Sequence, residues 1–536
     1  MGQTDQAMNR DCDVLVLGSG PAGTSAALPI VESGASLVMV AGRPWVPSTQ
    51  PAGTYRDLRL SDGQCWRWLL GDDYAALKMQ AALSPKFRVP ALLQVFDGFS
   101  ARTIESSEGF YPVGSLAAGG LSNAWGCGVA EFSEQDLAAF PAAARELCES
   151  YQRVCHRIGV SGGQGDDLVS EYGLEGLCEP STQIHPVAAK LLAAHQRRPQ
   201  RDADFSLGRS RLAAIAGPRG DRKGCQASGR CLWGCPNQAI YSARMELPFL
   251  QLRANCTLVH GLADRIDRAP AGWSVSINTD AGPMVVNCRR LVVAAGTLES
   301  TRLVLSVLGA VGQRTRFLST PMAAYALWVP AAVGTLPASG SALPQLSFAL
   351  KLAAQTTAHG ALFPTTGLPI SEFARKAPLS LAASYALFPA LLASSLVGNV
   401  FLSSDYSDNW LALGAQGKLK LHGGLKPQAH KYFAAARSAL RAKFIKRGAV
   451  LLPGSFTIGL PGTDVHYGGS IPMSDSPGFM QCNAYGEVTG LARLHVVDGA
   501  ILPAIPGKSH TLTIMANADR IGRHIGAQLR AERILA

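Results

Sequence analysis

The stretch Asp13-Val14-Leu15-Val16-Leu17-Gly18-Ser19-Gly20-Pro21-Ala22-Gly23 decides the fold of this chain. Its first five residues form a short apolar run that is typical of a buried parallel strand. A small-residue helix follows to about Ser33, and residues 35–40 form the next apolar strand. In such a βαβ unit, G-x-G-x-x-G allows a tight turn, a close approach of a pyrophosphate and close packing of helix on strand. The pattern predicts a Rossmann-like dinucleotide site. The alternative interpretation is an ordinary glycine-rich turn. The predicted contacts are Gly18, Ser19, Gly20, Pro21, Ala22 and Gly23.

A second strand–glycine–helix unit lies far along the chain. Leu291-Val292-Val293-Ala294-Ala295-Gly296 is a buried strand that ends in glycine, and a helix is expected over 298–308. We also expect strands at 256–260 and 273–278 and an amphipathic helix over 135–158. Two such units indicate one nucleotide-binding domain that is assembled from distant segments.

Composition places the chain among globular proteins. It has 536 residues, a formal charge of +11 and 47% hydrophobic residues, which excludes disordered and collagen-like chains. The 12 cysteines are irregularly spaced, which favours a reducing compartment. The polar N-terminus lacks an export signal, so we expect a cytoplasmic protein. No nucleic-acid-binding motif is present.

Two segments leave a membrane contact open. Residues 377–402 carry no charge, and they are interpreted as a buried or interfacial helix pair, a bilayer span or a lid beside a hydrophobic substrate. Residues 411–447 hold nine basic and no acidic residues, which indicates either a solvated helix face or attraction to anionic lipid or a phosphorylated substrate.

Four further motifs, in order, carry a family resemblance. Gly119-Gly120-Leu121-Ser122-Asn123-Ala124-Trp125-Gly126-Cys127-Gly128 is a glycine-rich loop. The C-terminal 75 residues contain Val465-His466-Tyr467-Gly468-Gly469, then Asp498-Gly499, and then Lys508-Ser509-His510-Thr511. With the N-terminal turn and Ala294-Ala295-Gly296, this ordered set resembles the glucose–methanol–choline (GMC) family of FAD-dependent oxidoreductases.

The resemblance implies an α/β fold with two domains. A Rossmann-like FAD-binding domain with a parallel sheet would use residues 8–45, 100–135, 220–310 and 485–536. An α+β substrate domain with an antiparallel sheet would use 46–99, 136–219 and 311–484.

The resemblance also implies the site residues. His466 matches the catalytic histidine and His510 the second active-site position, while His495 is expected to be structural. Asp498 is expected to hold a ribityl hydroxyl or backbone donors. Besides the N-terminal turn, the implied FAD contacts are Gly119, Gly120, Ser122, Asn123, Trp125, Ala295, Asp498, Gly499 and Thr511.

Three departures from the family pattern concern bound groups. The acidic residue expected after the second strand is missing from Val40-Ala41-Gly42-Arg43, and Arg43 leaves NADP as an alternative to FAD. The Gly119 loop resembles the pyranose oxidase-like version, but Ala124 replaces the histidine that some relatives join to the flavin, so we expect noncovalent FAD. Cys225, Cys231 and Cys235 are interpreted as reduced thiols, an iron–sulfur cluster or a zinc site.

The implied reaction is oxidation of a CH–OH group by hydride transfer to flavin N5, with His466 as base. The loop favours a sugar-like or glycosylated alcohol, and the apolar stretch favours a hydrophobic alcohol or sterol at a membrane surface. The electron acceptor is dioxygen, a quinone or a protein. The alternatives are a non-redox FAD enzyme, such as a lyase or decarboxylase, and a peripheral membrane protein that uses FAD structurally.

Overall fold

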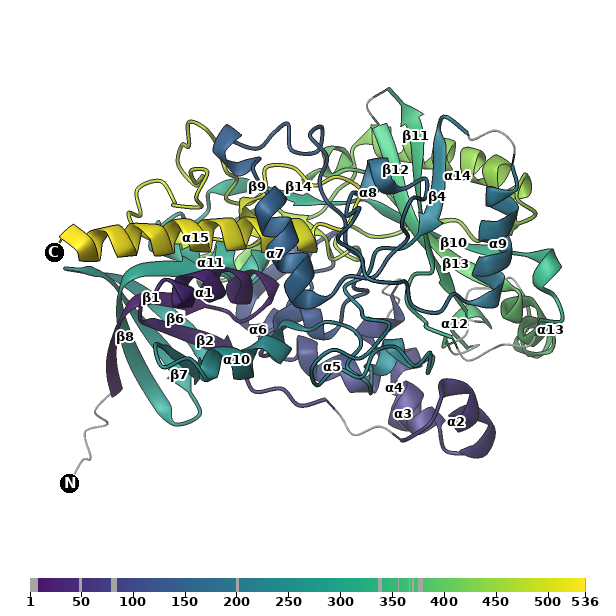
Figure 1. The fold of residues 1–536 in the computed structure, drawn as a ribbon, viewed down its shortest axis with the longest axis horizontal. Helices are drawn as coiled ribbons and strands as arrows, with labels where there is room; N and C mark the ends of the chain where they lie inside the picture. Colours follow the sequence, from purple (N-terminus) through teal and green to yellow (C-terminus); the bar gives the residue numbers. More distant parts are fainter. Residues whose placement is uncertain are drawn as a thin grey trace.

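The computed structural model describes residues 8–47, 51–78, 84–198, 202–335, 340–354, 356–365, 367–368, 371–374 and 379–535. Figure 1 shows a first, mainly parallel sheet at one end and an antiparallel sheet at the other, with both chain ends beside the first sheet. The α/β class with a parallel and an antiparallel sheet is therefore confirmed.

The first sheet contains the N-terminal strand at its centre. The strand order is β5-β2-β1-β8-β7-β6, and β19 also pairs with β8. Strands β1, β2, β5, β8 and β19 run parallel, whereas β6 and β7 form an antiparallel extension. Their bounds are β1 Met8–Leu17, β2 Leu37–Gly42, β5 Cys256–His260, β6 Leu262–Ala269, β7 Gly272–Thr279, β8 Gly282–Val293 and β19 Leu494–Val496.

Three helices belong to this sheet: α1 (Pro21–Glu32), α11 (Thr297–Val307) and α15 (Thr511–Leu535). Helix α15 runs along α1 in Figure 1. Glycines permit this contact, because a Cβ on Gly522 would lie 2.4 Å from the Ala26 carbonyl oxygen. The helix that begins beside the candidate histidine His510 is thereby fixed to the helix that follows the dinucleotide turn.

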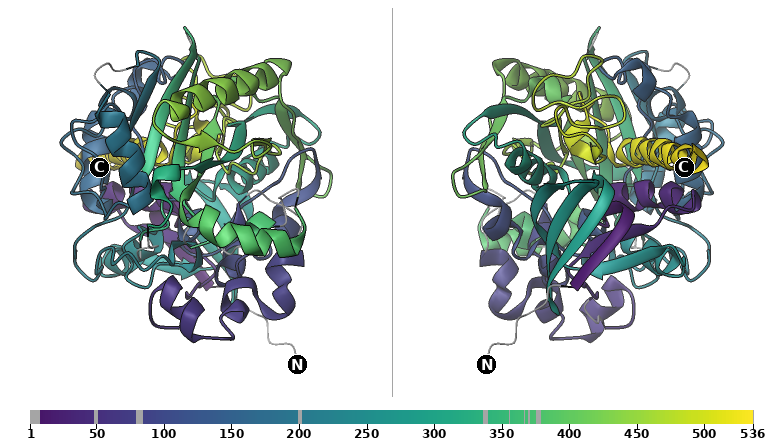
Figure 2. Two further views of the ribbon diagram at one scale, coloured as in Figure 1. Left: turned by 90° about the vertical axis from the view of Figure 1, so that its right-hand side faces the viewer. Right: turned by 90° about the vertical axis from the view of Figure 1, so that its left-hand side faces the viewer.

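The second sheet is antiparallel, with the order β16-β10-β13-β12-β11-β4 and with β17 also paired to β10. Its strands are β4 Phe205–Arg209, β10 Met322–Trp328, β11 Leu346–Ala353, β12 Thr356–Pro364, β13 Ser395–Phe401, β16 Val450–Leu451 and β17 Thr457–Ile458. Helices α9 (Pro186–Gln196) and α14 (Pro427–Ile445) pack on it through Leu191, Phe433 and Phe444. Figure 2 shows these helices on the outside of the molecule.

A third, five-stranded sheet was not expected, and its order is β18-β9-β14-β15-β3. The strands are β3 Ile104–Glu108, β9 Arg314–Ser319, β14 Asn409–Leu413, β15 Leu419–His422 and β18 Tyr467–Gly468. β3 comes from the segment assigned to the FAD-binding domain, yet it pairs with β15, which comes from the segment assigned to the substrate domain. β18 brings the residue after His466 into this sheet.

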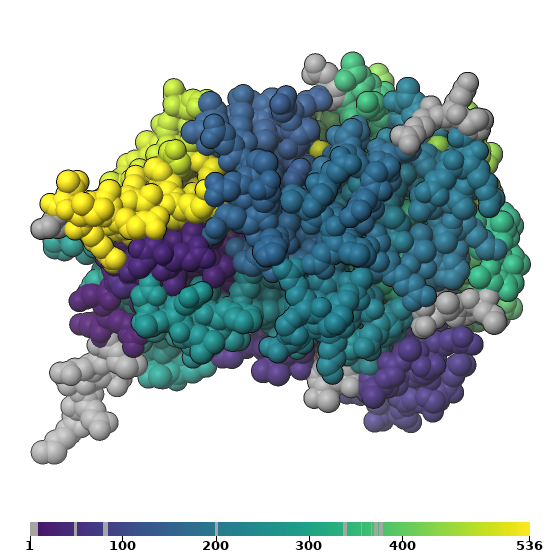
Figure 3. All heavy atoms as spheres, viewed as in Figure 1, coloured from purple at the N-terminus to yellow at the C-terminus, as the bar shows by residue number. Residues whose placement is uncertain are grey.

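The remaining helices are short and lie mostly between the sheets and along one edge (Figure 1). They are α2 Tyr55–Ser61, α3 Trp66–Leu70, α4 Ala75–Lys78, α5 Pro90–Phe96, α6 Phe99–Thr103, α7 Cys148–Ile158, α8 Val169–Tyr172, α10 Leu247–Gln251, α12 Ser371–Ala374 and α13 Leu381–Ala393. In Figure 3 residues of about 130–240 cover much of the visible face between the two large sheets.

Two predicted elements differ from the structure. The helix predicted over 135–158 is present only as α7, since Pro141 cannot donate a backbone hydrogen bond and Arg145 instead binds the Phe140 and Ala138 carbonyls of a turn. The predicted helix pair in 377–402 is wrong, because α13 is followed by strand β13, which pairs with β10 and β12. Residues 377 and 378 lie outside the described residues.

The apolar stretch is partly exposed. Ser384 and Phe388 of α13 are buried, whereas Leu381, Tyr385 and Leu387 are half or more exposed. Across the described residues, none of the helices has the length and apolar character that crossing a membrane requires.

The basic run of 411–447 is distributed over β14, β15 and α14. Three of its nine basic residues, Lys420, Lys443 and Arg447, form ion pairs with acidic residues of other segments. The run therefore serves partly to attach α14 and β15 to the rest of the protein. The nine residues are Lys418, Lys420, Lys426, Lys431, Arg437, Arg441, Lys443, Lys446 and Arg447.

The dinucleotide turn gives a first prediction. A Cβ on Gly23 would lie 1.9 Å from the Gly18 carbonyl oxygen, whereas a Cβ on Gly20 would meet nothing within 4 Å. Gly23→Ala should therefore destabilise the protein by about 1–3 kcal/mol, visible as a lower Tm. Gly20→Ala is the matched control and should fold with an unchanged Tm. Equal Tm values for the two variants would contradict this account of the turn.

Candidate active site

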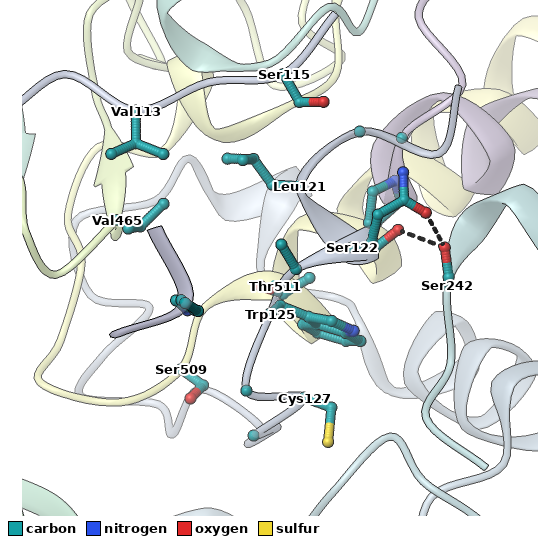
Figure 4. A pocket seen from close by; sticks show the side chains of 18 of the residues that line it. Val113, Ser115, Leu121, Ser122, Trp125, Cys127, Ser242, Val465, Ser509 and Thr511 are labelled. Atoms are coloured by element: carbon teal, nitrogen blue, oxygen red, sulfur yellow. Dashed lines mark hydrogen bonds between the residues drawn. The ribbon is translucent and has the colours of Figure 1, made fainter. Parts of the chain in front are cut away.

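A cavity of about 720 Å³ lies where the first sheet meets the other two. Its wall contains the β1–α1 turn, the Gly119 loop, the start of α11, the His466 segment and the start of α15. Strands β10, β12 and β13 of the antiparallel sheet form another part of the wall. In Figure 4 the labelled side chains, among them Val113, Trp125, Val465 and Thr511, come from several of these segments. Motifs that are far apart in the sequence thus surround one space.

The dinucleotide turn has the shape that a pyrophosphate needs. Gly18 has a φ of +108°, and a Cβ there would lie 2.3 Å from the Ala294 carbonyl oxygen, so only glycine fits. Gly20 opens to free space, and it caps α1 without a side-chain hydrogen bond. Because the first turn of α1 holds no acidic residue, its N-terminal N–H groups and helix dipole favour an anion there.

The side chain of Ser19 joins two segments of the cavity wall. Its hydroxyl donates to the Ala41 carbonyl (2.6 Å) and accepts from the Gly119 N–H (3.0 Å). Gly119 and Gly120 have φ values of +88° and +59°, and a Cβ on Gly120 would lie 3.4 Å from Gly20 Cα. Ser19 therefore holds the Gly119 loop against the dinucleotide turn.

The polar side chains of the Gly119 loop bind a neighbouring segment. Ser122 accepts from the Ala243 N–H (2.9 Å), and the Ser242 hydroxyl donates to Asn123 Oδ1 (2.7 Å), as Figure 4 shows for Ser242. The Trp125 indole N–H donates to the Tyr241 carbonyl (2.8 Å). These residues line the cavity and position the loop, while their hydrogen bonds go to residues 241–243.

Asp498 joins the second strand–glycine–helix unit to the C-terminal segment. Its carboxylate accepts from the Gly296 N–H (2.9 Å), the Ser300 hydroxyl (2.5 Å) and the Ala500 N–H (3.0 Å). Burial raises its pKa, while these donors oppose that rise. Of the two roles predicted for Asp498, the structure shows the contact with backbone donors. Ala295, Gly499 and Thr511 line the same part of the cavity.

The end of β2 shows what replaces the missing acidic residue. The Arg43 N–H donates to the Leu116 carbonyl, and the Ala118 N–H donates to the Arg43 carbonyl, both at 2.8 Å. The Arg43 side chain is half exposed and lies 3.9 Å from Asp97. It is absent from the cavity wall, so the structure does not place this cation where a ribose phosphate would need it.

His466 and His510 come together as predicted. Their ring centroids are 4.9 Å apart with planes at 70°, and both rings line the cavity. His466 also stacks on Phe401 at the end of β13, at 5.0 Å. Burial lowers the pKa of His466 well below its usual range, with His510 and Lys86 adding repulsion, and lowers the pKa of His510 to about 4. Both imidazoles are therefore neutral at physiological pH.

Two residues that the sequence analysis missed fix the tautomer of His466. When Asp464 is ionised, the Thr320 hydroxyl donates to Asp464 Oδ2 (3.2 Å), and the imidazole then donates in the contact of 3.0 Å between His466 Nδ1 and Thr320 Oγ1. Asp464 also accepts from the N–H groups of Thr320, His466 and Gly462. Among the described residues Nε2 has no hydrogen-bond partner, which makes it the basic nitrogen on the cavity side.

The comparisons with known proteins agree with this geometry. Residues 455–518, which include Asp464, His466 and His510, match the family model described as GMC oxidoreductase. The chain carries a GMC oxidoreductase C-terminal domain. No curated protein sequence matches significantly.

Solved structures of two oxidases share the overall fold. Pyridoxine 4-oxidase from Mesorbium loti is 14% identical with a TM-score of 0.56, covering 96% of this chain and 99% of that one. Formate oxidase is 13% identical with a TM-score of 0.60, covering 97% and 99%. A variant of the Aspergillus oryzae RIB40 formate oxidase, studied for FAD modification, is 13% identical with a TM-score of 0.59, and the match covers 97% of this chain and 99% of that one. The predicted GMC resemblance is confirmed, and the FAD cofactor of that family fits the cradle of the dinucleotide turn.

The three cysteines are not arranged as metal ligands. Among the described residues, no group of three or more His, Cys, Asp or Glu side chains is placed to hold a metal ion. The Cys235 sulfur instead accepts from the Ala239 N–H (3.3 Å), and the Cys231 sulfur contacts the Ser341 hydroxyl (3.8 Å). Cys225 is partly buried and free, as are Cys231 and Cys235. The structure therefore supports neither the iron–sulfur nor the zinc alternative.

Asp498 gives a second prediction. Asp498→Ala would leave the N–H groups of Gly296 and Ala500 and the Ser300 hydroxyl without this acceptor, at a cost of about 1–3 kcal/mol for each group that is buried. The expected result is a lower Tm and a weaker affinity of the apoprotein for added FAD, measured by fluorescence titration. Ser300→Ala removes only one donor to the same carboxylate and should have a smaller effect. A larger effect of Ser300→Ala would contradict the central position of Asp498.

Proposed function

We propose that this protein is an FAD-dependent oxidoreductase that oxidises a CH–OH group, with FAD bound noncovalently and His466 as the general base. The observation that carries the proposal is the His466–Thr320–Asp464 arrangement inside the cavity that also holds the dinucleotide turn. FAD, when bound, supplies a hydride acceptor at its N5 atom.

The residues around His466 explain how it would take a proton. Neutral Nε2 accepts the hydroxyl proton of the substrate, and the resulting imidazolium donates from Nδ1 to Thr320. Thr320 in turn donates to the Asp464 carboxylate, so the new positive charge is oriented and stabilised. His510, 4.9 Å away between ring centroids, is placed to hydrogen-bond the same hydroxyl oxygen and stabilise a developing alkoxide.

The substrate side of the cavity is mainly apolar. Met322, Leu343, Phe363, Val397 and Phe401 line it from the antiparallel sheet and its neighbours. Such a wall fits the hydrocarbon body of an alcohol and offers few partners for the hydroxyls of a sugar. Of the two predicted substrate classes, it supports a hydrophobic alcohol.

The proposed base gives a third prediction. His466→Ala should still bind FAD, but anaerobic bleaching of the flavin by a reactive alcohol should slow by about 10²–10⁴-fold, the usual contribution of a positioned base. The measurement is stopped-flow absorbance with a panel of aliphatic, aromatic, sugar and steroid alcohols. Admission of air after bleaching then shows whether dioxygen is an acceptor.

Two variants sharpen this test. His495→Gln changes a buried histidine that binds the Tyr485 carbonyl and is absent from the cavity wall, so bleaching should proceed at the normal rate. Thr320→Val removes the hydroxyl that fixes the tautomer and should give an intermediate rate. Unchanged bleaching in His466→Ala would remove His466 from the mechanism.

The Gly119 loop gives a fourth prediction. Ala124 is a buried cavity residue and has no atom that can form a bond to the flavin. Acid precipitation of the holoenzyme should therefore release the yellow colour into the supernatant, and addition of FAD to the apoprotein should restore the visible spectrum. Yellow colour that stays in the pellet would show a covalent attachment elsewhere.

A further inference from the structure

Lys86 is a cationic cavity residue that neither the motifs nor the proposed proton transfer uses. It lies in the short 3₁₀ turn Pro85–Phe87 and lines the cavity beside the His466 segment. Phe87 anchors this turn, since its ring packs against Phe96 (5.5 Å) and Tyr111 (5.9 Å). The backbone of Lys86 is thus held in place by a buried aromatic neighbour.

The ammonium group of Lys86 has no anionic partner among the described residues. Its one recorded contact is with the Phe87 ring, 5.7 Å from the centroid. Three other cations of the wall form ion pairs: Arg102 with Glu299 (3.1 Å), Arg211 with Asp166 (2.7 Å) and Lys508 with Asp136 (2.5 Å). Arg244 also lines the cavity, and its guanidinium lies over the Trp45 ring, 5.0 Å from the centroid.

The carboxylates of the wall are already engaged. Asp464 accepts hydrogen bonds from Thr320 and His466, and Asp498 from Ser300 and two N–H groups. Glu299 binds Arg102, Thr103 and Arg302. None of the three is recorded as a partner of Lys86, so the charge of its ammonium is left for a molecule in the cavity.

Packing places Lys86 on the histidine side of the cavity. The ring of its neighbour Phe87 packs against Tyr111 (5.9 Å), and the Tyr111 carbonyl accepts from the hydroxyl of Tyr467 (3.0 Å), the residue after His466. Repulsion from Lys86 also helps to lower the pKa of His466. The pyrophosphate cradle belongs instead to the turn Gly18–Gly23 and the start of α1.

An unpaired ammonium in such a place is costly, because burial penalises the charged form. Burial lowers the pKa of Lys86 to about 8. An anion in the cavity would restore the favourable pairing, and a single ammonium matches the single charge of a carboxylate.

We propose that the substrate carries a carboxylate which pairs with Lys86 while its hydroxyl group lies between His466 and His510. Its apolar body would pack against Phe363, Val397 and Phe401. This inference rests on the proposed alcohol oxidation and specifies its substrate class as a hydroxy acid with a hydrocarbon or aromatic body.

The test compares matched donors on the holoenzyme. 4-(Hydroxymethyl)benzoate and 6-hydroxyhexanoate are each compared with their methyl esters in anaerobic bleaching. The acids should react at least about tenfold faster than the esters, the factor that corresponds to 1.4 kcal/mol. In Lys86→Met this ratio should fall to about one, and in Lys86→Glu the esters should become the better donors. Lys431→Met, a change of an exposed lysine on α14, should keep the wild-type ratio.

A binding measurement separates this inference from the proposed reaction. Benzoate and cyclohexanecarboxylate, which have no hydroxyl group, should perturb the flavin spectrum of the wild-type protein at concentrations at least tenfold lower than in Lys86→Met. Benzamide should show no such difference. If no alcohol bleaches the flavin, the proposed function fails, and the carboxylate-binding measurement alone then decides the role of Lys86. Equal acid-to-ester ratios or equal carboxylate affinities in wild type and Lys86→Met would overturn the inference.

Discussion

The close approach of Gly18 to the end of β8 is the contact on which the rest of the structure depends. Gly18 lies so near the Ala294 carbonyl that a methyl group would overlap it, and Gly23 lies equally close to Gly18. Only glycine permits β1, α1 and β8 to meet in this way. Because the chain runs from β8 directly to Gly296, whose N–H donates to Asp498, this contact sets the C-terminal segment and hence His466 and His510.

The side of the cavity that contains His466 and His510 is built by the second and third sheets. Thr320 connects β9 with β10, Phe401 ends β13, and Tyr467 begins β18, so three elements from two sheets fix the ring of His466. The first sheet provides the cradle for a dinucleotide, and the second and third position His466, the proposed base, and the apolar wall. The cavity exists only where these parts meet.

Much of the first sheet could be predicted from the sequence, because G-x-G-x-x-G and the β8 glycine have local conformational causes. The His466 and His510 pair could be predicted from motif order alone. Thr320 could not, since 146 residues separate it from His466 and nothing in its own neighbourhood marks it. Asp464 stands only two residues before His466, so this spacing was a signal in the sequence, whereas its hydrogen bonds to Thr320 depend on the fold. The strand β13 was missed because its apolar run continues that of α13, and periodicity does not separate two short buried elements.

The electrostatics of the cavity connect these observations. Burial raises the pKa of Asp464 to about 7 and lowers those of His466 and His510, so each group resists the charge that it would carry in water. A proton that arrives on His466 creates a positive charge in a place where Thr320 and Asp464 are already oriented to receive it. No dipole has to turn at that moment, which is the condition under which buried polar groups accelerate a reaction. The ammonium of Lys86 works against that charge on His466, and an anion bound beside it would remove the opposition. In the proposed complex with a carboxylate substrate, the charge of the substrate and the basicity of His466 are therefore coupled.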